Sequence, residues 1–388
     1  MDIKRLQEIF TKIYGGDSEC TFFSPGRINL IGEHIDYNGG YVFPCALDFG
    51  TYGLIKVRND NAINLASTNF DLKVNSNLDN LRFIESDDWA NYPKGVMKIM
   101  MDNGYDVKGM DILISGNIPN GAGLSSSASL EVLTAEIVNN LFNNGSIDKI
   151  EIAKMSQKAE NDFVGVNCGI MDQFAIRMGK KAKAILLNCE TLDYNYADVN
   201  LLDYEIVIMN TNKRRALNES KYNERRSECD KALEVIRKVK EVKNICELKP
   251  EEFDRIENLF TDEKIKNRAK HAVYENARVI SAFNCLNKGQ LLEFGRLLVE
   301  SHHSLKHLYE VTGKELDAIV EEALLTDGCI GARMTGAGFG GCAIALVKKD
   351  KIESFTIRVK SNYTKRIGYE PNFYSTGIGE GTHRVEPQ

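Results

Sequence analysis

The spacing of hydrophobic residues predicts most of the helices and strands of this chain. Leu6, Ile9 and Ile13 recur at helical spacing and predict a helix over residues 3–14. Short apolar runs bounded by polar residues predict strands instead. These runs lie at residues 51–57, 63–67, 111–115, 184–187, 204–210 and 342–347.

Helical spacing dominates most of the remaining sequence. Leu130, Leu133 and Ile137 fall on one face and predict a helix that opens at a polar, serine-rich stretch. A second helix is predicted at about 146–163 and ends in a glycine-containing loop over 164–172. Further helices are predicted after residues 89–95, at about 214–240, and over most of the sequence up to 325.

The length of the chain predicts two domains, because 388 residues exceed one typical domain. A shift to helix-rich sequence places the boundary near residues 180–200. We therefore expect an N-terminal domain over 1–180 and a C-terminal domain over 181–388, with an approximate boundary.

Composition adds constraints on class and location. The chain has 43% hydrophobic and 27% charged residues, as ordinary globular proteins do, and its formal charge of −6 does not favour nucleic acid or anionic membranes. Nine scattered cysteines without a C-x-x-C pair indicate reduced thiols. The charged N-terminus does not resemble a signal peptide, and no apolar run approaches the ~20 residues of a membrane span. These features predict a cytoplasmic protein.

One glycine- and serine-rich stretch, Gly121-Ala-Gly-Leu-Ser-Ser-Ser-Ala-Ser129, lies between a predicted strand and a predicted helix. Glycines let a backbone approach a ligand closely, and the N–H groups at a helix N-terminus favour an anion such as phosphate. Serine is also a favoured N-cap, so a plain capped helix start explains the stretch as well. A cap needs one serine, however, and here four lie within five residues.

The common nucleotide-binding motifs do not account for this stretch. A Walker A motif needs Ser or Thr after Gly-Lys, and both Gly-Lys pairs of the chain lack it. The protein-kinase H-R-D tripeptide is absent. Residues 336–341 fit G-x-G-x-x-G, but a predicted strand follows them where a dinucleotide-binding fold has a helix.

Three segments together resemble the GHMP small-molecule kinases, and within them the galactokinase family. They are Gly26-Arg-Ile-Asn-Leu-Ile-Gly-Glu-His-Ile-Asp-Tyr37, the serine-rich stretch ending at Ser129, and Thr335-Gly-Ala-Gly-Phe-Gly-Gly341. Connecting segments at residues 89–92, 168–173, 220–226, 304–311 and 315–317 agree in the same order. The glycine-rich segments mark the superfamily, whereas the first segment is far more specific.

The resemblance implies a fold and a reaction. The expected fold is the two-domain α+β GHMP kinase fold, with a ribosomal-protein-S5-domain-2-like N-terminal domain, a C-terminal α+β domain, and the active site in the cleft between them. The expected reaction transfers a phosphoryl group from ATP to the anomeric hydroxyl of D-galactose by direct in-line displacement with Mg²⁺, giving α-D-galactose 1-phosphate and ADP. This is the first committed step of galactose breakdown.

The resemblance also implies the residues around the sugar. Asp172 receives the proton of the anomeric hydroxyl, and Arg27 keeps Asp172 anionic and offsets charge on the transferred group. Whether Asp172 abstracts the proton or mainly orients the hydroxyl stays open, because a loose transition state asks little of a base. The implied sugar contacts are Glu33, His34, Ile35, Asp36, Gly169 and Tyr222. Carboxylates and an imidazole suit vicinal hydroxyls as hydrogen-bond partners.

The nucleotide and the metal are assigned in the same way. The implied ATP contacts are Gly121, Ala122, Gly123, Leu124, Ser125, Ser126, Ser127, Ser67, Trp89 and Tyr92, with the two aromatic residues flanking adenine. The implied Mg²⁺ ligands are Ser127 and Glu160, since magnesium keeps several waters and needs few protein oxygens. The late glycines at 336–341 are expected to pack near the phosphate loop and the sugar.

Two other functions stay open. A kinase for a related sugar, such as N-acetylgalactosamine or arabinose, differs in pocket volume that the sequence does not give. A non-catalytic sensor of galactose and ATP could lose Asp172 or part of the serine-rich stretch, and both are intact here. We expect small-molecule partners only, no nucleic acid or membrane, and a monomer or weak oligomer.

Overall fold

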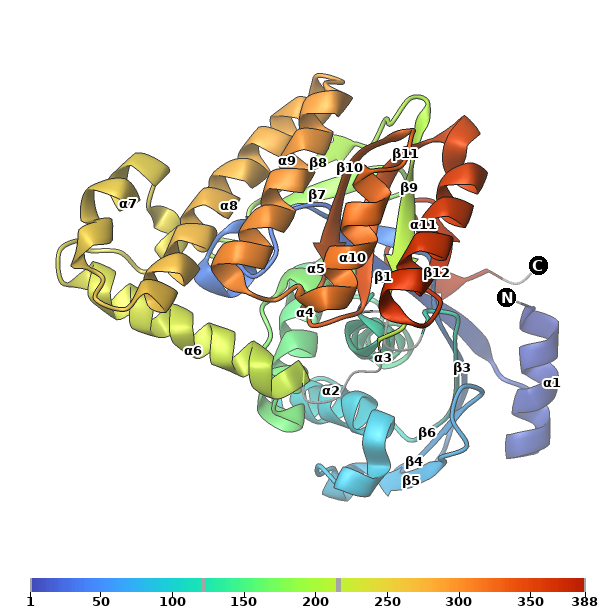
Figure 1. The fold of residues 1–388 in the computed structure, drawn as a ribbon. Helices are drawn as coiled ribbons and strands as arrows, with labels where there is room; N and C mark the ends of the chain where they lie inside the picture. Colours follow the sequence, from blue (N-terminus) through green and yellow to red (C-terminus); the bar gives the residue numbers. More distant parts are fainter. Residues whose placement is uncertain (1, 120–122, 214–217, 387–388) are drawn as a thin grey trace.

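A computed structural model of the protein describes residues 2–119, 123–213 and 218–386. The chain begins with α1 (Ile3–Tyr14) and builds three β-sheets that helices cover. In Figure 1 most of the first half of the chain (residues 2–178) lies below the orange-to-red helices of the second half (residues 199–386), whereas the green strands within 183–198 lie beside those helices. The labels N and C lie on the same side of the molecule. None of the helices in the described ranges combines the length and the apolar character that crossing a bilayer requires.

The largest sheet has six strands in the order β13-β1-β3-β6-β4-β5. Its strands are β1 (Cys20–Asn29), β3 (Pro44–Val57), β4 (Ala62–Ser67), β5 (Val74–Asn77), β6 (Met110–Gly116) and β13 (His383–Val385). Neighbours are antiparallel except β4 and β6, which are parallel. Because β13 pairs with β1, the last residues of the chain return to the sheet in which the first strand lies.

Both faces of this sheet are buried, because side chains alternate between faces along each strand. Leu54 and Leu113 pack on Phe10 of α1, whereas Ile55 and Ile112 belong to the core on the other face. Four helices cover that other face: α2 (Asn91–Asp102), α3 (Ser126–Phe142), α4 (Lys149–Lys158) and α5 (Met171–Met178). Helices α3 and α5 lie against the strands, and α2 and α4 pack on α3.

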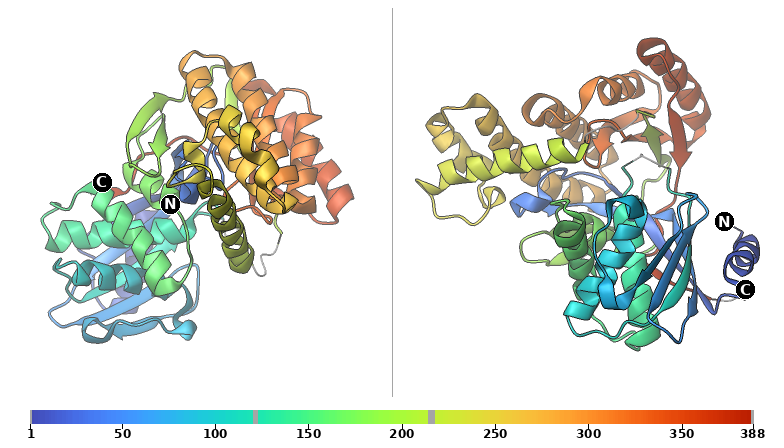
Figure 2. Two further views of the ribbon diagram at one scale, coloured as in Figure 1. Left: turned by 90° about the vertical axis from the view of Figure 1, so that its left-hand side faces the viewer. Right: turned by 90° about the horizontal axis from the view of Figure 1, so that it is seen from below.

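The second half is built on an antiparallel sheet in the order β10-β11-β9-β12. Its strands are β9 (Tyr204–Asn210), β10 (Cys329–Thr335), β11 (Cys342–Lys348) and β12 (Asn372–Ser375). The helices of this half are α6 (Asn218–Arg237), α7 (Pro250–Ile256), α8 (Glu263–Asn287), α9 (Leu291–Ser304), α10 (Gly313–Leu324) and α11 (Ile352–Ile367). Helices α9, α10 and α11 pack on the sheet, and α8 packs on α9 (Figure 2).

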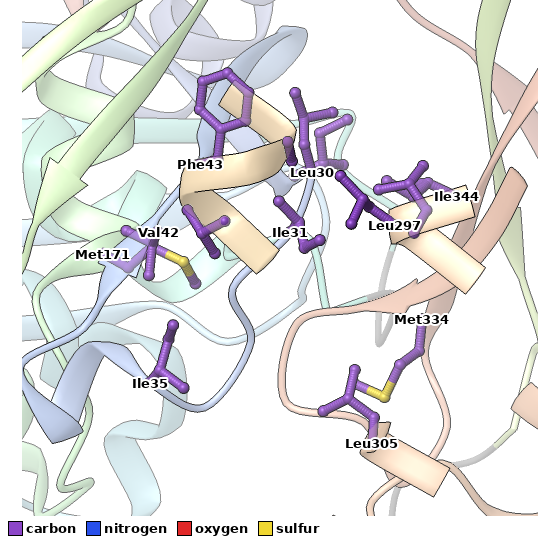
Figure 3. Packing of buried hydrophobic residues seen from close by; sticks show 14 of the residues in the cluster. Leu30, Ile31, Ile35, Val42, Phe43, Met171, Leu297, Leu305, Met334 and Ile344 are labelled. Atoms are coloured by element: carbon purple, nitrogen blue, oxygen red, sulfur yellow. The ribbon is translucent and has the colours of Figure 1, made fainter. Parts of the chain in front are cut away.

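A third sheet and one shared core join the two halves. The sheet contains β2 (Tyr41–Val42), β7 (Lys183–Asn188) and β8 (Tyr194–Asp198). The core cluster that contains Ile31 and Ile35 of the first half also contains Leu297, Met334 and Ile344 of the second, as Figure 3 shows. The segment that follows β1 is therefore held between the two halves.

Most predicted elements are confirmed, and several boundaries differ. The helix predicted over residues 3–14 is α1, and each predicted strand is present. The helix predicted at about 146–163 starts later, because the Asp148 side chain caps it by accepting the N–H groups of Ile150 and Glu151. After α4 it continues as a π-helix, η4 (Ala159–Val164), a geometry that often marks functional sites.

Other differences concern where helices begin. Helix α2 begins at Asn91, so residues 91–95 are already helical, and the described part of the predicted 214–240 helix is α6. The loop predicted over 164–172 ends early, since α5 begins at Met171 and places Asp172 in its first turn. The domain boundary near residue 180 stays a prediction.

Candidate active site

A cavity of about 300 Å³ lies where the two halves meet. Its walls come from β1 and the segment after it, the N-terminal end of α3, the π-helix η4, the first turn of α5, helix α6 and the loop after β10. The predicted site residues that line it are Arg27, Glu33, His34, Asp36, Tyr92, Gly123, Ser125, Ser126, Ser127, Glu160, Gly169, Asp172 and Tyr222. The fold therefore gathers at one place residues that are far apart in the sequence.

A paired arginine and aspartate lie in this cavity. The Arg27 Nε donates to Asp172 Oδ1 at 2.6 Å, and its Nη2 donates to Asp172 Oδ2 at 2.7 Å, so the pair is bidentate. Burial is the largest single influence and lowers the pKa of Arg27. The charge and hydrogen bonds of Asp172, with the charges of Glu33 and Asp36, together outweigh it, so the net pKa lies above its usual value. The hydroxyl of Ser125 also donates to Asp172 Oδ2. The aspartate is thus fixed by two motifs of the first half.

The carboxylates predicted to contact the sugar lie in the same cavity. Glu33 Oε1 accepts the backbone N–H of Gly336 at 2.7 Å and lies 3.4 Å from Arg333 Nη1. Burial, the largest cause, and the nearby charge of Asp172 together raise the pKa of Asp36 to about 7. Ile35 is different, because its side chain is fully buried in the shared core and does not line the cavity.

The backbone at Gly169 comes very close to Asp36. A Cβ atom built on Gly169 would lie 2.0 Å from Asp36 Oδ2, so only glycine fits without moving the carboxylate. Tyr222 reaches the cavity from α6 of the second half. Arg226, one turn later on α6, donates to the backbone oxygen of Asn167 at 2.8 Å and so ties this helix to the first half.

His34 lines the cavity, but protein groups occupy both of its ring nitrogens. Nε2 lies 3.1 Å from the carbonyl oxygen of Ala337, which only accepts, and Nδ1 lies 2.8 Å from the Tyr37 hydroxyl. Burial and the neighbouring His271 lower the pKa of His34 to about 3, so the ring is neutral. Nε2 therefore carries the proton, and Nδ1 accepts from Tyr37. His34 adopts a left-handed backbone (φ 63°), which brings this polar segment to the late glycines.

The late glycine segment packs as predicted, close to both the sugar contacts and the serine-rich stretch. A Cβ atom on Gly336 would lie 2.8 Å from the carbonyl oxygen of Gly123. Its own N–H donates to Glu33. The glycines thus permit close backbone contact between the halves.

The serine-rich stretch opens helix α3 at the cavity. Gly121 and Ala122 lie outside the described residues, and Leu124 is buried in the core rather than in the cavity wall. Ser125 occupies the N-cap position of α3, but its side chain makes no capping hydrogen bond and donates to Asp172 instead. The plain-cap interpretation therefore fails, and the first turn with Ser126 and Ser127 faces the cavity.

A second cavity of about 170 Å³ adjoins the first and shares Tyr92, Ser126 and Ser127 with it. Ser67 and Trp89 line this second cavity. The ring paired with Trp89 belongs to Phe70, which the sequence did not single out: the centroids lie 6.5 Å apart and the planes differ by 20°. Phe70 is 44% exposed, although it is a large hydrophobic residue.

Glu160 and Ser127 lie next to each other in the wall of the first cavity. The Ser127 hydroxyl hydrogen-bonds to the Glu160 carboxylate, while burial, the dominant effect, raises the pKa of Glu160 to about 7. Within residues 2–119, 123–213 and 218–386, no group of three or more His, Cys, Asp and Glu side chains is arranged to hold a metal ion.

Some lining residues were missed by sequence reasoning. Val166, Cys168 and Met171 line the first cavity. They lie in the loop and motif just before Asp172, and this position in the sequence could have identified them. Thr51 and Phe70 line the second cavity. Thr51 belongs to β3 and Phe70 follows β4, and no motif near either residue marks it as part of a site.

Comparisons with known proteins identify the relatives of this chain. The chain matches family models described as the galactokinase galactose-binding signature at residues 8–57, the GHMP kinases N terminal domain at 91–180 and the GHMP kinases C terminal at 282–365. It is 63% identical to a galactokinase of Clostridium tetani over 99% of this chain and 98% of that protein. It is 54% identical to a galactokinase of Clostridium beijerinckii over 99% of each.

Solved structures extend the comparison. The crystal structure of Lactococcus lactis galactokinase complexed with galactose matches with a TM-score of 0.96 and 47% identity, covering 99% of this chain and 100% of that one. A Methanococcus jannaschii mevalonate kinase matches with a TM-score of 0.67 at 21% identity, covering 94% of this chain and 99% of that one, which shows a shared fold.

Proposed function

The chain belongs to the galactokinase family of the GHMP kinases, and from that premise we propose how its own residues transfer a phosphoryl group from ATP to galactose. It has the two-domain α+β fold of that family, and it phosphorylates galactose with ATP. The roles of individual residues, the metal and the choice of hydroxyl are our inferences from the geometry.

The bidentate pair of Arg27 and Asp172 is the observation that carries the proposed mechanism. The Asp172 carboxylate accepts or orients the proton of the anomeric hydroxyl. As that O–H bond weakens, the sugar oxygen bonds to the γ-phosphorus of ATP, and the bond from this phosphorus to the β-phosphate oxygen breaks to release ADP. Arg27 keeps Asp172 charged and offsets the negative charge on the transferred group. The product is α-D-galactose 1-phosphate.

The sugar is held by the polar residues around this pair. Asp36 and Glu33 offer carboxylate oxygens to the hydroxyls, and Gly169 and Tyr222 complete the contacts from two sides. We infer that the His34 ring forms part of the cavity wall and offers no free nitrogen to the sugar hydroxyls, because both ring nitrogens already have protein partners. Ile35, buried in the core, supports this segment.

ATP occupies the two adjoining cavities. We assign its phosphates to the N-terminus of α3, where Gly123 and Ser125 to Ser127 present polar groups at the positive end of the helix. Gly121 and Ala122 keep the same expected role outside the described residues. Adenine enters the second cavity between Trp89 and Phe70, with Tyr92 at the junction and Ser67 at its wall.

The residues present fit a magnesium ion, which the family implies. Ser127 and Glu160 supply oxygen ligands in the cavity wall, and neither the hydrogen bonds nor the ion pairs of the described residues give Glu160 a basic partner. Few protein ligands suit Mg²⁺, because waters and the phosphates of ATP complete its shell. When bound, Mg²⁺ supplies charge stabilisation to the phosphates.

One assay tests the sugar specificity and the role of Asp172. ADP release should be measured with galactose, N-acetylgalactosamine, arabinose, glucose and mevalonate, and galactose should give the highest kcat/KM. Asp172→Asn should lower kcat about 10²- to 10⁴-fold without weakening galactose binding. A higher kcat/KM for another sugar would favour the related-sugar kinase, and Asp172→Asn turnover near wild type would remove this residue from the mechanism.

We also infer a cytoplasmic enzyme that acts as a monomer or weak oligomer on small molecules alone. The nine cysteines, all unpaired thiols, support a reducing compartment. Sedimentation of the purified chain with and without galactose measures its oligomeric state, and a stable dimer would contradict the inference.

A further inference from the structure

A buried amide bridges two buried carboxylates behind the cavity. The side-chain Nε2 of Gln173 donates to Glu131 Oε2 at 2.9 Å and to Glu160 Oε2 at 2.7 Å. An amide nitrogen has two hydrogens, so one points to each carboxylate. Glu160 lines the cavity, whereas Glu131 does not and is 0% exposed.

The three residues come from the elements that carry the proposed chemistry. Glu131 lies one helical turn after Ser127 on α3, so both share one face of that helix. Gln173 follows Asp172 in the first turn of α5. Glu160 lies on the π-helix η4. The bridge therefore connects the phosphate-binding helix, the helix of the proposed catalytic aspartate and the carboxylate proposed to hold the metal.

Two polar atoms of the bridge formed by Gln173, Glu131 and Glu160 lack hydrogen-bond partners. Glu131 Oε1 and Gln173 Oε1 are both buried without a hydrogen-bond partner. Among the described residues, no lysine, arginine or histidine forms an ion pair with Glu131 or Glu160. Buried carboxylates are normally paired, and unsatisfied polar atoms in native structures call for an explanation. A purely structural helix contact would be better served by apolar side chains.

The bridge fixes the orientation of Glu160. Oε2 of this carboxylate accepts from Gln173 and also from the Cys168 thiol at 3.2 Å. With that oxygen held on the protein side, the carboxylate presents its remaining lone pairs toward Ser127 and the cavity. Groups that hold a metal ligand in this way tune metal affinity without touching the metal.

We propose that Gln173 and Glu131 are positioning residues for the metal-binding carboxylate of Glu160. The inference rests on the proposed function, because it takes Ser127 and Glu160 as the Mg²⁺ ligands. Gln173 fixes the angle of the Glu160 carboxylate, and Glu131, which accepts from the same amide nitrogen, fixes Gln173.

Two variants test the two hydrogen bonds of the bridge separately. Gln173→Met keeps the length of the side chain and removes both donated hydrogen bonds, while Glu131→Met removes only the acceptor that holds Gln173 from behind. Binding of Mn²⁺ to the complex of full-length enzyme and ADP, followed by electron paramagnetic resonance, should weaken about 10- to 100-fold in each variant. Galactose binding, measured by calorimetry without metal, should stay unchanged.

Glu136→Gln is the matched control, because Glu136 is also a nearly buried carboxylate of α3 but pairs with Arg177 at 3.0 Å away from the cavity. Its Mn²⁺ affinity should equal that of the wild type. Unchanged Mn²⁺ binding in both bridge variants, with weakened binding in Glu160→Gln, would overturn the positioning role alone. Unchanged binding in Glu160→Gln would instead overturn the proposed metal site. Equal losses of metal and galactose affinity in Glu136→Gln and the bridge variants would show a general loss of structure and also overturn the inference.

Discussion

Phe70→Ala tests the aromatic slot in which we place adenine. The rings of Phe70 and Trp89 are nearly parallel, 20° apart, with centroids separated by 6.5 Å. An inserted planar base needs roughly 3.4 Å on each face, about the centre-to-centre spacing of stacked bases along one strand, so the two rings are spaced to hold one base between them. Phe70 is 44% exposed, so its ring is accessible to a ligand in the second cavity.

The magnitude follows from the stacking that the substitution removes. Replacing a stacking aromatic with alanine costs about 1–3 kcal/mol per base in single-stranded nucleic-acid complexes. Trp89 stays in place as the other wall, and Phe70 is only partly buried before ligand binding, so we expect the lower part of that range, about 1–2 kcal/mol. Since 1.4 kcal/mol is a factor of ten, the KM for ATP should rise about 5- to 30-fold.

Steady-state ADP release at saturating galactose measures this KM directly. The KM for galactose should not change, because Phe70 lines only the second cavity. Phe83→Ala is the matched control: Phe83 is 48% exposed and contacts Phe163 edge-on, outside both cavities. If Phe70→Ala leaves the KM for ATP within twofold of wild type, or if Phe83→Ala raises it equally, the slot is not the adenine site.

Three further substitutions test the sugar side. Arg27→Met should lower kcat at least about hundredfold, because it removes a preorganised charge at the transferred group and the partner of Asp172; a kcat near wild type in the same assay would refute its role. Because the pKa of Asp36 is raised to about 7 in the free protein, its carboxyl is protonated below that pH and accepts fewer hydroxyl hydrogens. Galactose affinity by calorimetry should therefore rise with pH through about 7 and then level, and Asp36→Asn should abolish the dependence; a flat wild-type profile argues against it. Gly169→Ala adds a Cβ 2.0 Å from Asp36 Oδ2 and should raise the KM for galactose tenfold or more while leaving that for ATP unchanged, and an unchanged galactose KM would contradict this steric argument.

The parts of the site that the sequence predicted are those in which several special residues lie close together in the chain. The segment from Gly26 to Tyr37 contains buried charges that a core rejects, so its functional character was visible before folding. The serine cluster was visible for the same reason, and the Ser125 hydroxyl bond to Asp172 excludes the plain-cap interpretation. The periodicity of hydrophobic residues predicted which strands and helices exist. The residue at which a helix begins depends instead on a single capping side chain, such as that of Asp148.

The parts that could not be predicted depend on contacts between distant segments. Phe70 follows a strand as an isolated aromatic residue, and its role depends on Trp89 lying opposite. Glu131 has the spacing of an ordinary helix surface residue, yet tertiary packing buries it completely beside Gln173. Pairing of β13 with β1 joins residues more than 350 positions apart, which periodicity does not encode.

The hydrogen bonds around Asp172 suggest why both halves are needed for one reaction. Arg27 and Ser125 hold the carboxylate from two motifs of the first half. The second half closes the site through Gly336, whose backbone approaches Gly123 and donates to Glu33, and through Tyr222 on α6. A phosphoryl transfer with a loose transition state gains most from positioning donor and acceptor in line, and little from a strong base. The late glycines meet that need, because Gly336 lies against the backbone of Gly123 in the serine-rich stretch and donates its N–H to the Glu33 carboxylate, so one segment holds both.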